Sequence, residues 1–186
     1  MKFTKTVIAI TFFAVLASSP TAASDYEVTV IDDGPFSFEI RGIKLNQGST
    51  LSKQGFLLNA EDCPVSISDT KTSINYVDRG FRFQATTSVI VDRPVVAMRI
   101  RTVLFNAFGQ HMMNLRNTVI EDFGEGATTL DTATWRASET DVSEHLSSVT
   151  FVSRVRFADG TQWAYDEDDI EEALRSLQLE EQIADD

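Results

Sequence analysis

A strict two-residue alternation runs through residues 80–91. Every second position carries a small or apolar side chain, namely Phe81, Phe83, Ala85, Thr87, Val89 and Val91. The positions between them hold Arg82, Gln84, Thr86 and Ser88. Successive side chains of a strand point to opposite faces, so this pattern is typical of an antiparallel strand with one buried face and one hydrated face.

The same alternation recurs beyond clear turn signals. In residues 95–106 one face would carry Val96, Met98, Ile100, Thr102 and Leu104. In residues 149–157 one face would carry Val149, Phe151, Ser153, Val155 and Phe157. Asp159-Gly160 follows as a hairpin signal, because this pair tolerates positive φ at low cost. Shorter candidate strands are residues 26–31, 36–45, 55–59, 72–77, 111–122 and 161–165.

These segments predict an all-β fold. About eight or nine short strands with regular turns are typical of a sandwich. The inward face switches near Gly42, which predicts a bulge there. No internal repeat or linker divides the chain, so we expect one immunoglobulin-like antiparallel β-sandwich over residues 24–165.

Two segments depart from the two-residue pattern. Residues 124–146 are ambiguous, although Ser138-Glu-Thr-Asp141 resembles a capping box and predicts a short helical turn. Residues 166–186 are expected to form a short acidic C-terminal helix and a tail. Ile170, Leu174 and Leu177 have helical spacing, and Asp166 suits the N-cap position.

The N-terminus predicts export. Residues 1–23 combine a basic start, an apolar run from Val7 to Leu16 and small residues before position 24, which is the pattern of a signal peptide. The run is shorter than the ~20 apolar residues of a membrane span, so the alternative of an uncleaved anchor is disfavoured. We expect a periplasmic or secreted protein whose mature chain does not insert into the membrane.

The charge excludes two classes of partner. The formal net charge is −12, and loss of residues 1–23 would remove two lysines and no acid, giving −14. Such a chain is repelled by nucleic acid and by anionic membrane surfaces. We therefore expect neither nucleic-acid binding nor peripheral lipid binding.

Signals of catalysis or of a metal site are poor. The single cysteine, Cys63, can form no internal disulfide, and we expect it to be a buried apolar residue. Nothing in the spacing joins it to His111 or His145, and no phosphate loop or nucleophile elbow occurs. The acids Asp166–Asp169 raise the alternative of calcium, but a solvated helix start explains them better. We expect no cofactor, no metal and no enzymatic activity.

Arginines give the one distinctive surface pattern. Arg99 with Arg101, and Arg154 with Arg156, are i, i+2 pairs on the outward faces of two strands. If those strands are neighbours, the four residues would form a basic stripe able to bind an anionic ligand or an acidic segment. The alternative is pairing with acids such as Glu39 or Glu121, together with cover from the C-terminal helix. Trp135, in the ambiguous segment, is a further candidate contact.

Two segments resemble known exported domains. Residues 96–109 resemble the central strand and turn of FxLYD-type domains: Leu104 fits the Leu of that motif, Phe105 stands for its Tyr, Asn106 for its Asp and Gly109 for the turn Gly, while Thr102 replaces the leading Phe. Residues 155–163 also resemble a closing hairpin of uncharacterised exported bacterial sandwiches. The resemblance implies an immunoglobulin-like fold and a bacterial envelope setting, and it brings no catalytic residues.

The predicted function is therefore a non-enzymatic module that binds another envelope protein or forms a homo-oligomer. Unpaired edge strands favour such contacts. The first alternative is a receptor for a small anionic or carbohydrate ligand that uses the arginines or Trp135. The second is a hydrolase that uses Cys63 or a pair of carboxylates.

Overall fold

The computed structural model describes residues 26–32, 38–40, 43–45, 53–77 and 79–179. The predicted signal peptide, the face switch near Gly42 and the tail from Glu180 onward lie outside this part of the chain. The described residues include no helix long and apolar enough to cross a membrane.

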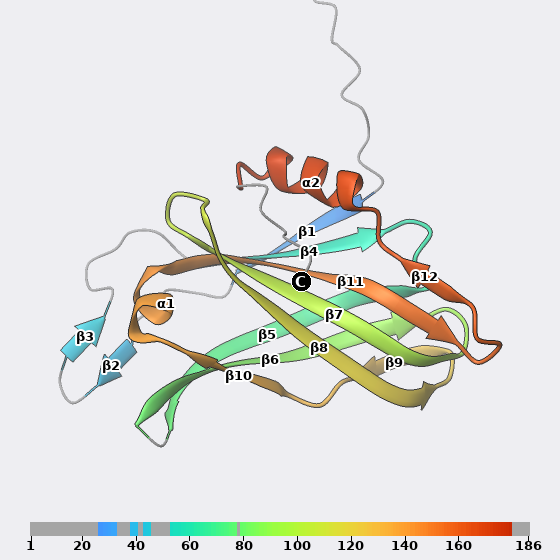
Figure 1. The fold of residues 1–186 in the computed structure, drawn as a ribbon, viewed down its shortest axis with the longest axis horizontal. Helices are drawn as coiled ribbons and strands as arrows, with labels where there is room; N and C mark the ends of the chain where they lie inside the picture. Colours follow the sequence, from blue (N-terminus) through green and yellow to red (C-terminus); the bar gives the residue numbers. More distant parts are fainter. Residues whose placement is uncertain (1–25, 33–37, 41–42, 46–52, 78, 180–186) are drawn as a thin grey trace, which may run out of the picture.

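Two sheets face each other, which confirms the all-β sandwich (Figure 1). The larger sheet contains, in spatial order, β1 (Tyr26–Asp32), β4 (Gln54–Ala60), β11 (His145–Phe157), β7 (Val95–Asn106) and β8 (His111–Phe123). Strand β12 (Gln162–Ala164) also pairs with β11. The smaller sheet contains, in spatial order, β10 (Ala133–Ala137), β6 (Gly80–Val91) and β5 (Val65–Val77). Strand β9 (Gly126–Thr129) also pairs with β6. A separate hairpin joins β2 (Phe38–Ile40) to β3 (Ile43–Leu45). The pairing is antiparallel except between β4 and β11, which run parallel.

The alternation in β6 builds the core as the sequence predicts. Phe83 and Val89 are 1 % and 0 % exposed, and the four other residues predicted to share their face are also buried. Val89 belongs to a cluster with Met98 and Ile100 of the opposite sheet, as expected for the space between two sheets.

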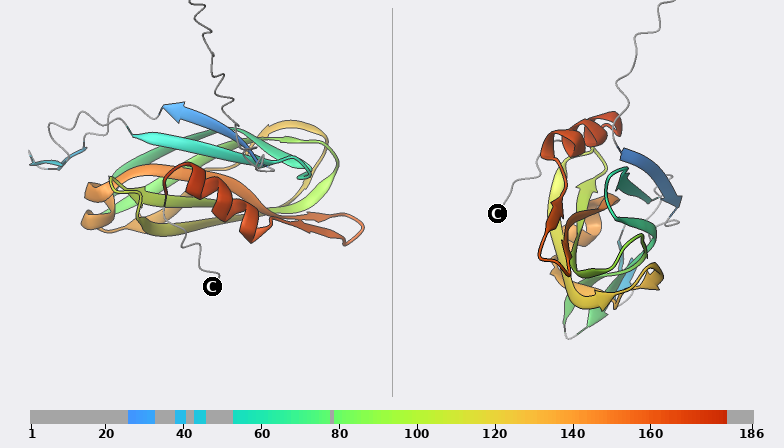
Figure 2. Two further views of the ribbon diagram at one scale, coloured as in Figure 1. Left: turned by 90° about the horizontal axis from the view of Figure 1, so that it is seen from above. Right: turned by 90° about the vertical axis from the view of Figure 1, so that its right-hand side faces the viewer.

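The helix α2 (Glu167–Ser176) adds a third layer on the outer face of the larger sheet (Figure 2). The Asp166 carboxylate caps it by accepting a hydrogen bond from the Asp168 amide, as predicted. Ile170, Ala173 and Leu174 are fully buried. They pack in one cluster with sheet residues that include Val103, Phe105, Val149 and Phe151. The part of the outer face beneath α2 is therefore a second hydrophobic core and is not exposed to solvent.

A bulge in β11 divides this strand into two parts. The register with β7 shifts between Val152 and Arg154. Before the shift, Val149 and Phe151 pack under α2, whereas after it Val155 and Phe157 join the core between the sheets. The prediction that these four residues and Ser153 share one face is therefore wrong, because one extra residue reverses the alternation.

The ambiguous segment contains β9, β10 and a short helix, α1 (Glu139–Glu144). The predicted capping box at its start is confirmed. Ser138 Oγ accepts from the Asp141 amide, and the Asp141 carboxylate accepts from the Ser138 amide.

Candidate functional site

Three of the four predicted arginines meet on the uncovered half of the larger sheet. Strands β7 and β11 are direct neighbours, and Arg99 lies opposite Arg154 in their register. Arg156 follows two residues later and is exposed like Arg154. The condition for a basic stripe, that the two strands are adjacent, is therefore met.

The arginines border a small depression, which we call the arginine pocket. It has a volume of about 160 Å³ and is lined by Ala97, Met98, Arg99, Thr118, Arg154, Val155, Arg156 and Gln162. Ala97 lies opposite Arg156 on β11 and opposite Ile120 on β8, so a small side chain separates larger ones in this row. Thr118 lies opposite Arg99, and Gln162 opposite Arg156.

No acid neutralises these three side chains within the part of the chain that the structure describes. Arg99 Nε donates to Thr118 Oγ1 at 3.1 Å, a neutral acceptor. The ion pairs Lys71–Asp69 and Arg175–Glu171 lie elsewhere. Like charges directly opposite in an antiparallel pair are unfavourable, so the structure holds repulsive charges together here without an acid between them.

The two acids expected to pair with the arginines are Glu39 and Glu121. Glu39 lies on β2, in the separate hairpin, and its side chain is outside the described part. Glu121 lines a different depression, at the β8–β9 connection. Helix α2 covers the neighbouring half of the face and leaves Arg154 and Arg156 exposed.

Arg101 is separated from the other three by burial. It is only 2 % exposed. Its Nη1 donates to Tyr165 Oη at 2.6 Å, and its Nε donates to Asn114 Oδ1 at 3.2 Å. Its guanidinium carbon also lies 5.8 Å from the centre of the Phe151 ring. Arg101 therefore supports the junction between the sheet and the chain entering α2, and it is not a surface contact.

A second like-charged pair occurs on the smaller sheet. Arg136 of β10 lies opposite Arg82 of β6. There the Arg82 guanidinium turns back and donates to the carbonyl oxygen of Phe81 at 3.0 Å. This pair provides a natural comparison for the arginine pocket.

Trp135 does not lie in irregular chain, as the sequence suggested, but on β10. Its indole Nε1 donates to the Arg116 carbonyl oxygen at 3.1 Å, and its ring lies 6.2 Å from that of Phe83. With the polar atom bonded and the ring half-buried, Trp135 closes the side of the sandwich between β8 and β10.

Cys63 is buried, as predicted, in the core between the sheets. Burial raises the pKa of its thiol to about 12. The reactive form of cysteine is the thiolate, which low pKa values favour. This environment is therefore the reverse of the one that activates a nucleophile.

Burial lowers the pKa of both histidines. Burial, reinforced by the charge of Lys53, lowers the pKa of His145 to about 3. Burial and the charge of Arg101 also lower the pKa of His111. Lys53 is itself buried, donates to Thr72 Oγ1 at 3.2 Å and lies 5.6 Å from the centre of the Phe83 ring. Sequence reasoning did not identify Lys53, which precedes β4 and has no pattern to mark it.

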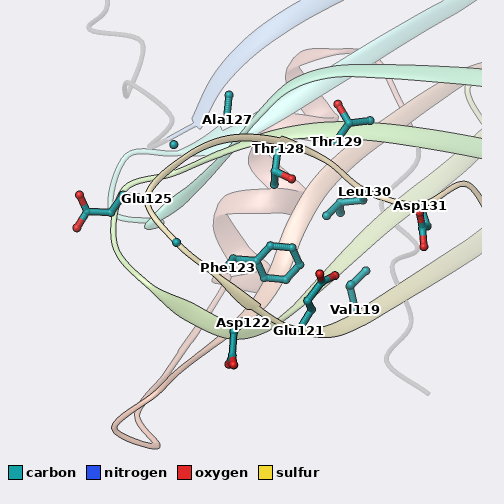
Figure 3. A pocket seen from close by; sticks show the side chains of 12 residues that line it. Val119, Glu121, Asp122, Phe123, Glu125, Ala127, Thr128, Thr129, Leu130 and Asp131 are labelled. Carbon is teal, nitrogen blue, oxygen red and sulfur yellow. The ribbon is translucent and has the colours of Figure 1, made fainter.

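Two acidic depressions lie elsewhere on the surface. The first, of about 450 Å³, lies between the end of β8 and β9, where Glu121 points inward and Asp122 and Glu125 point away (Figure 3). The second, of about 420 Å³, is lined by Ala60, Glu61, Asp62, Trp163, Ala164, Asp166 and Asp169. In the second, Asp62 accepts from the Trp163 indole and Asp166 caps α2. Among the residues with described positions, no three His, Cys, Asp or Glu side chains are grouped to hold a metal ion.

The chain matches no family model, no curated protein and no solved structure.

Proposed function

We propose that this protein is an exported, non-enzymatic binding module whose arginine pocket takes acidic side chains of a partner protein. The observation that carries the proposal is the meeting of Arg99, Arg154 and Arg156 without an acid among the described residues. The chain as a whole has a formal net charge of −12, so acids are abundant elsewhere. A guanidinium presents a planar fork of donors that matches a carboxylate.

The size of the pocket favours acidic side chains over a complete small molecule. Its volume of about 160 Å³ lies below the roughly 300–1,000 Å³ of sites that enclose drug-sized ligands. One or two carboxylates fit such a space. Ile120, in the same row of the sheet, is 82 % exposed and offers an apolar contact beside the charges.

The environments of the ionisable groups support binding over catalysis. Burial raises the pKa of the Cys63 thiol and lowers the pKa of both histidines, and such groups are not arranged to transfer protons at a surface. The arginines supply only hydrogen-bond donors and positive charge.

Fluorescence anisotropy with a labelled Glu-rich peptide tests the proposal. The purified protein is expected to bind this peptide and not a Lys-rich peptide of equal length, with affinity falling as salt rises. Reversing two charges in Arg99→Glu/Arg154→Glu should weaken binding at least tenfold. The control, Arg82→Glu/Arg136→Glu, changes the net charge equally at the other cross-strand arginine pair and should keep most of the affinity.

Equal losses in the two double variants would show a general charge effect and would refute the pocket. Competition by citrate or sulfate distinguishes the small-ligand alternative. If either ion occupied the pocket more tightly than the peptide, the protein would be a small-anion receptor instead.

A further inference from the structure

We propose that the partner segment is the acidic stretch Glu180–Asp186 of a second copy of this chain. This inference rests on the proposed function and names the occupant of the same pocket. It is supported by the position at which the described chain ends, by the chemistry of the residues that follow and by their distance from the pocket.

The chain is fixed at Leu179, on the face that carries the arginines. Helix α2 ends with Gln178 in the left-handed region, at φ 60°, and with the Leu179 amide bonded to the Leu174 carbonyl oxygen. This is a Schellman arrangement, in which the residue after the turn packs back on the helix. Leu179 is accordingly buried in the cluster beneath α2. The described chain therefore ends on the outer face of the larger sheet.

The residues that follow have the chemistry that the pocket requires. Positions 180–186 read Glu-Glu-Gln-Ile-Ala-Asp-Asp, which is four acids and one large apolar residue. The pocket offers three guanidinium groups, with the exposed Ile120 in the neighbouring position of the row. Ile183 stands between the two acidic pairs, so an extended segment could place it on Ile120 while carboxylates meet the arginines.

Distance favours a second copy over the same chain. Leu179 lies beside Gly109 in the β7–β8 turn, since a side-chain carbon at Gly109 would lie 3.6 Å from the Leu179 Cα. Arg99 is seven residues before Asn106, where β7 ends, which is about 23 Å along the strand. Seven residues span at most about 24 Å when fully extended. The chain's own segment would thus reach Arg99 with its last residue alone. The segment of a second copy has the same length but can start closer to the pocket.

Exchange of the two segments produces a closed dimer. Each copy donates one acidic segment and accepts one, so the two contacts are identical and related by a two-fold axis. No pocket is left over to add a third copy.

Sedimentation velocity over a range of protein concentrations tests the inference. The purified protein should dimerise reversibly, and Glu180→Gln/Glu181→Gln/Asp185→Asn/Asp186→Asn should weaken dimerisation at least tenfold. The matched control removes four acids from the depression beside β9, in Glu121→Gln/Asp122→Asn/Glu125→Gln/Asp131→Asn, and should dimerise like the parent protein.

A charge exchange tests direct contact. Arg99→Glu/Arg154→Glu should be monomeric, and adding Glu181→Lys and Asp185→Lys to that chain should restore the dimer. Dimerisation that survives neutralisation of residues 180–186 would overturn the inference. A protein that binds the Glu-rich peptide through its arginines but stays monomeric would also overturn it, while leaving the proposed function intact. Failure to bind any acidic peptide would remove both.

Discussion

The hydrogen bond between Arg101 and Tyr165 gives a stability prediction that separates the buried arginine from the three in the pocket. In Tyr165→Phe the ring stays, so its edge contact with Phe151, at 5.3 Å between ring centres, is kept. Only the hydroxyl that accepts from Arg101 at 2.6 Å is lost. The substitution therefore removes a bond to a buried cation and keeps the ring contact.

The expected loss follows from the charge and burial of the two groups. Hydrogen bonds to charged groups contribute about 1.5–3 kcal/mol. Tyr165 is half-buried, so water can partly replace the hydroxyl, and the lower end of this range applies. We expect Tyr165→Phe to reduce the free energy of unfolding by about 1.5 kcal/mol. For a chain of this size that corresponds to a fall in Tm of roughly 3–6 °C.

Urea unfolding followed by circular dichroism measures this difference, with an unchanged m-value as the check on two-state behaviour. Tyr76→Phe is the matched control, because Tyr76 is 41 % exposed and its ring also makes an edge contact, with Phe81. It should change stability by less than about 0.5 kcal/mol. Equal effects of the two substitutions would refute a structural role for the Arg101–Tyr165 bond. Binding of acidic peptides should be the same in both variants.

Three further predictions follow from single residues. Gly109→Ala should lower the free energy of unfolding by at least about 1 kcal/mol, because φ is 77° and the new carbon would lie 2.5 Å from the Gln178 carbonyl oxygen. Gly124→Ala, with open space around it, is the control in thermal unfolding. Equal Tm values of the two variants would contradict the contact. The pKa of His145 is lowered to about 3, so the unfolded state takes up the proton first, and stability should fall with pH below about 6.5 by up to ~1.4 kcal/mol per unit. His145→Asn should flatten that slope between pH 7 and 5, and an unchanged slope would count against a buried neutral imidazole. The Cys63 thiol, with its pKa raised to about 12, should resist iodoacetamide at pH 8 in the folded protein and react in urea; rapid alkylation without urea would show that it is accessible.

The sandwich could be predicted from the sequence because one physical rule, alternation of side chains across a strand, governs most of it. Strand β6 shows this directly, with Phe83 and Val89 buried on the predicted face. The rule fails in β11, where Val149 and Val155 look equivalent but face different cores. The register shift after Val152 depends on pairing with β7 and on cover by α2, and neither leaves a local signal. The immunoglobulin-like connectivity stays a prediction.

The site was predictable in part. The spacing placed Arg99 and Arg101 on one face, but it could not show that Arg101 is buried. That burial depends on Tyr165, which is 64 positions from Arg101 in the chain. The pocket residue Thr118 could not have been found from the turn alone, because the register between β7 and β8 shifts by one residue between Phe105 and Leu104. Without that shift Asn117 would lie opposite Arg99. Trp135 was misplaced because β10 has only five residues, and none of them is fully buried.

A titration followed by amide NMR tests the binding surface most directly. Adding the unlabelled Glu-rich peptide to the isotope-labelled protein should shift the backbone amides of Ala97, Thr118 and Gln162, which line the arginine pocket. The amides of Trp135 and of β9 should stay in place. Shifts confined to those latter residues, or no saturable shift at any amide, would contradict acid recognition by the three arginines.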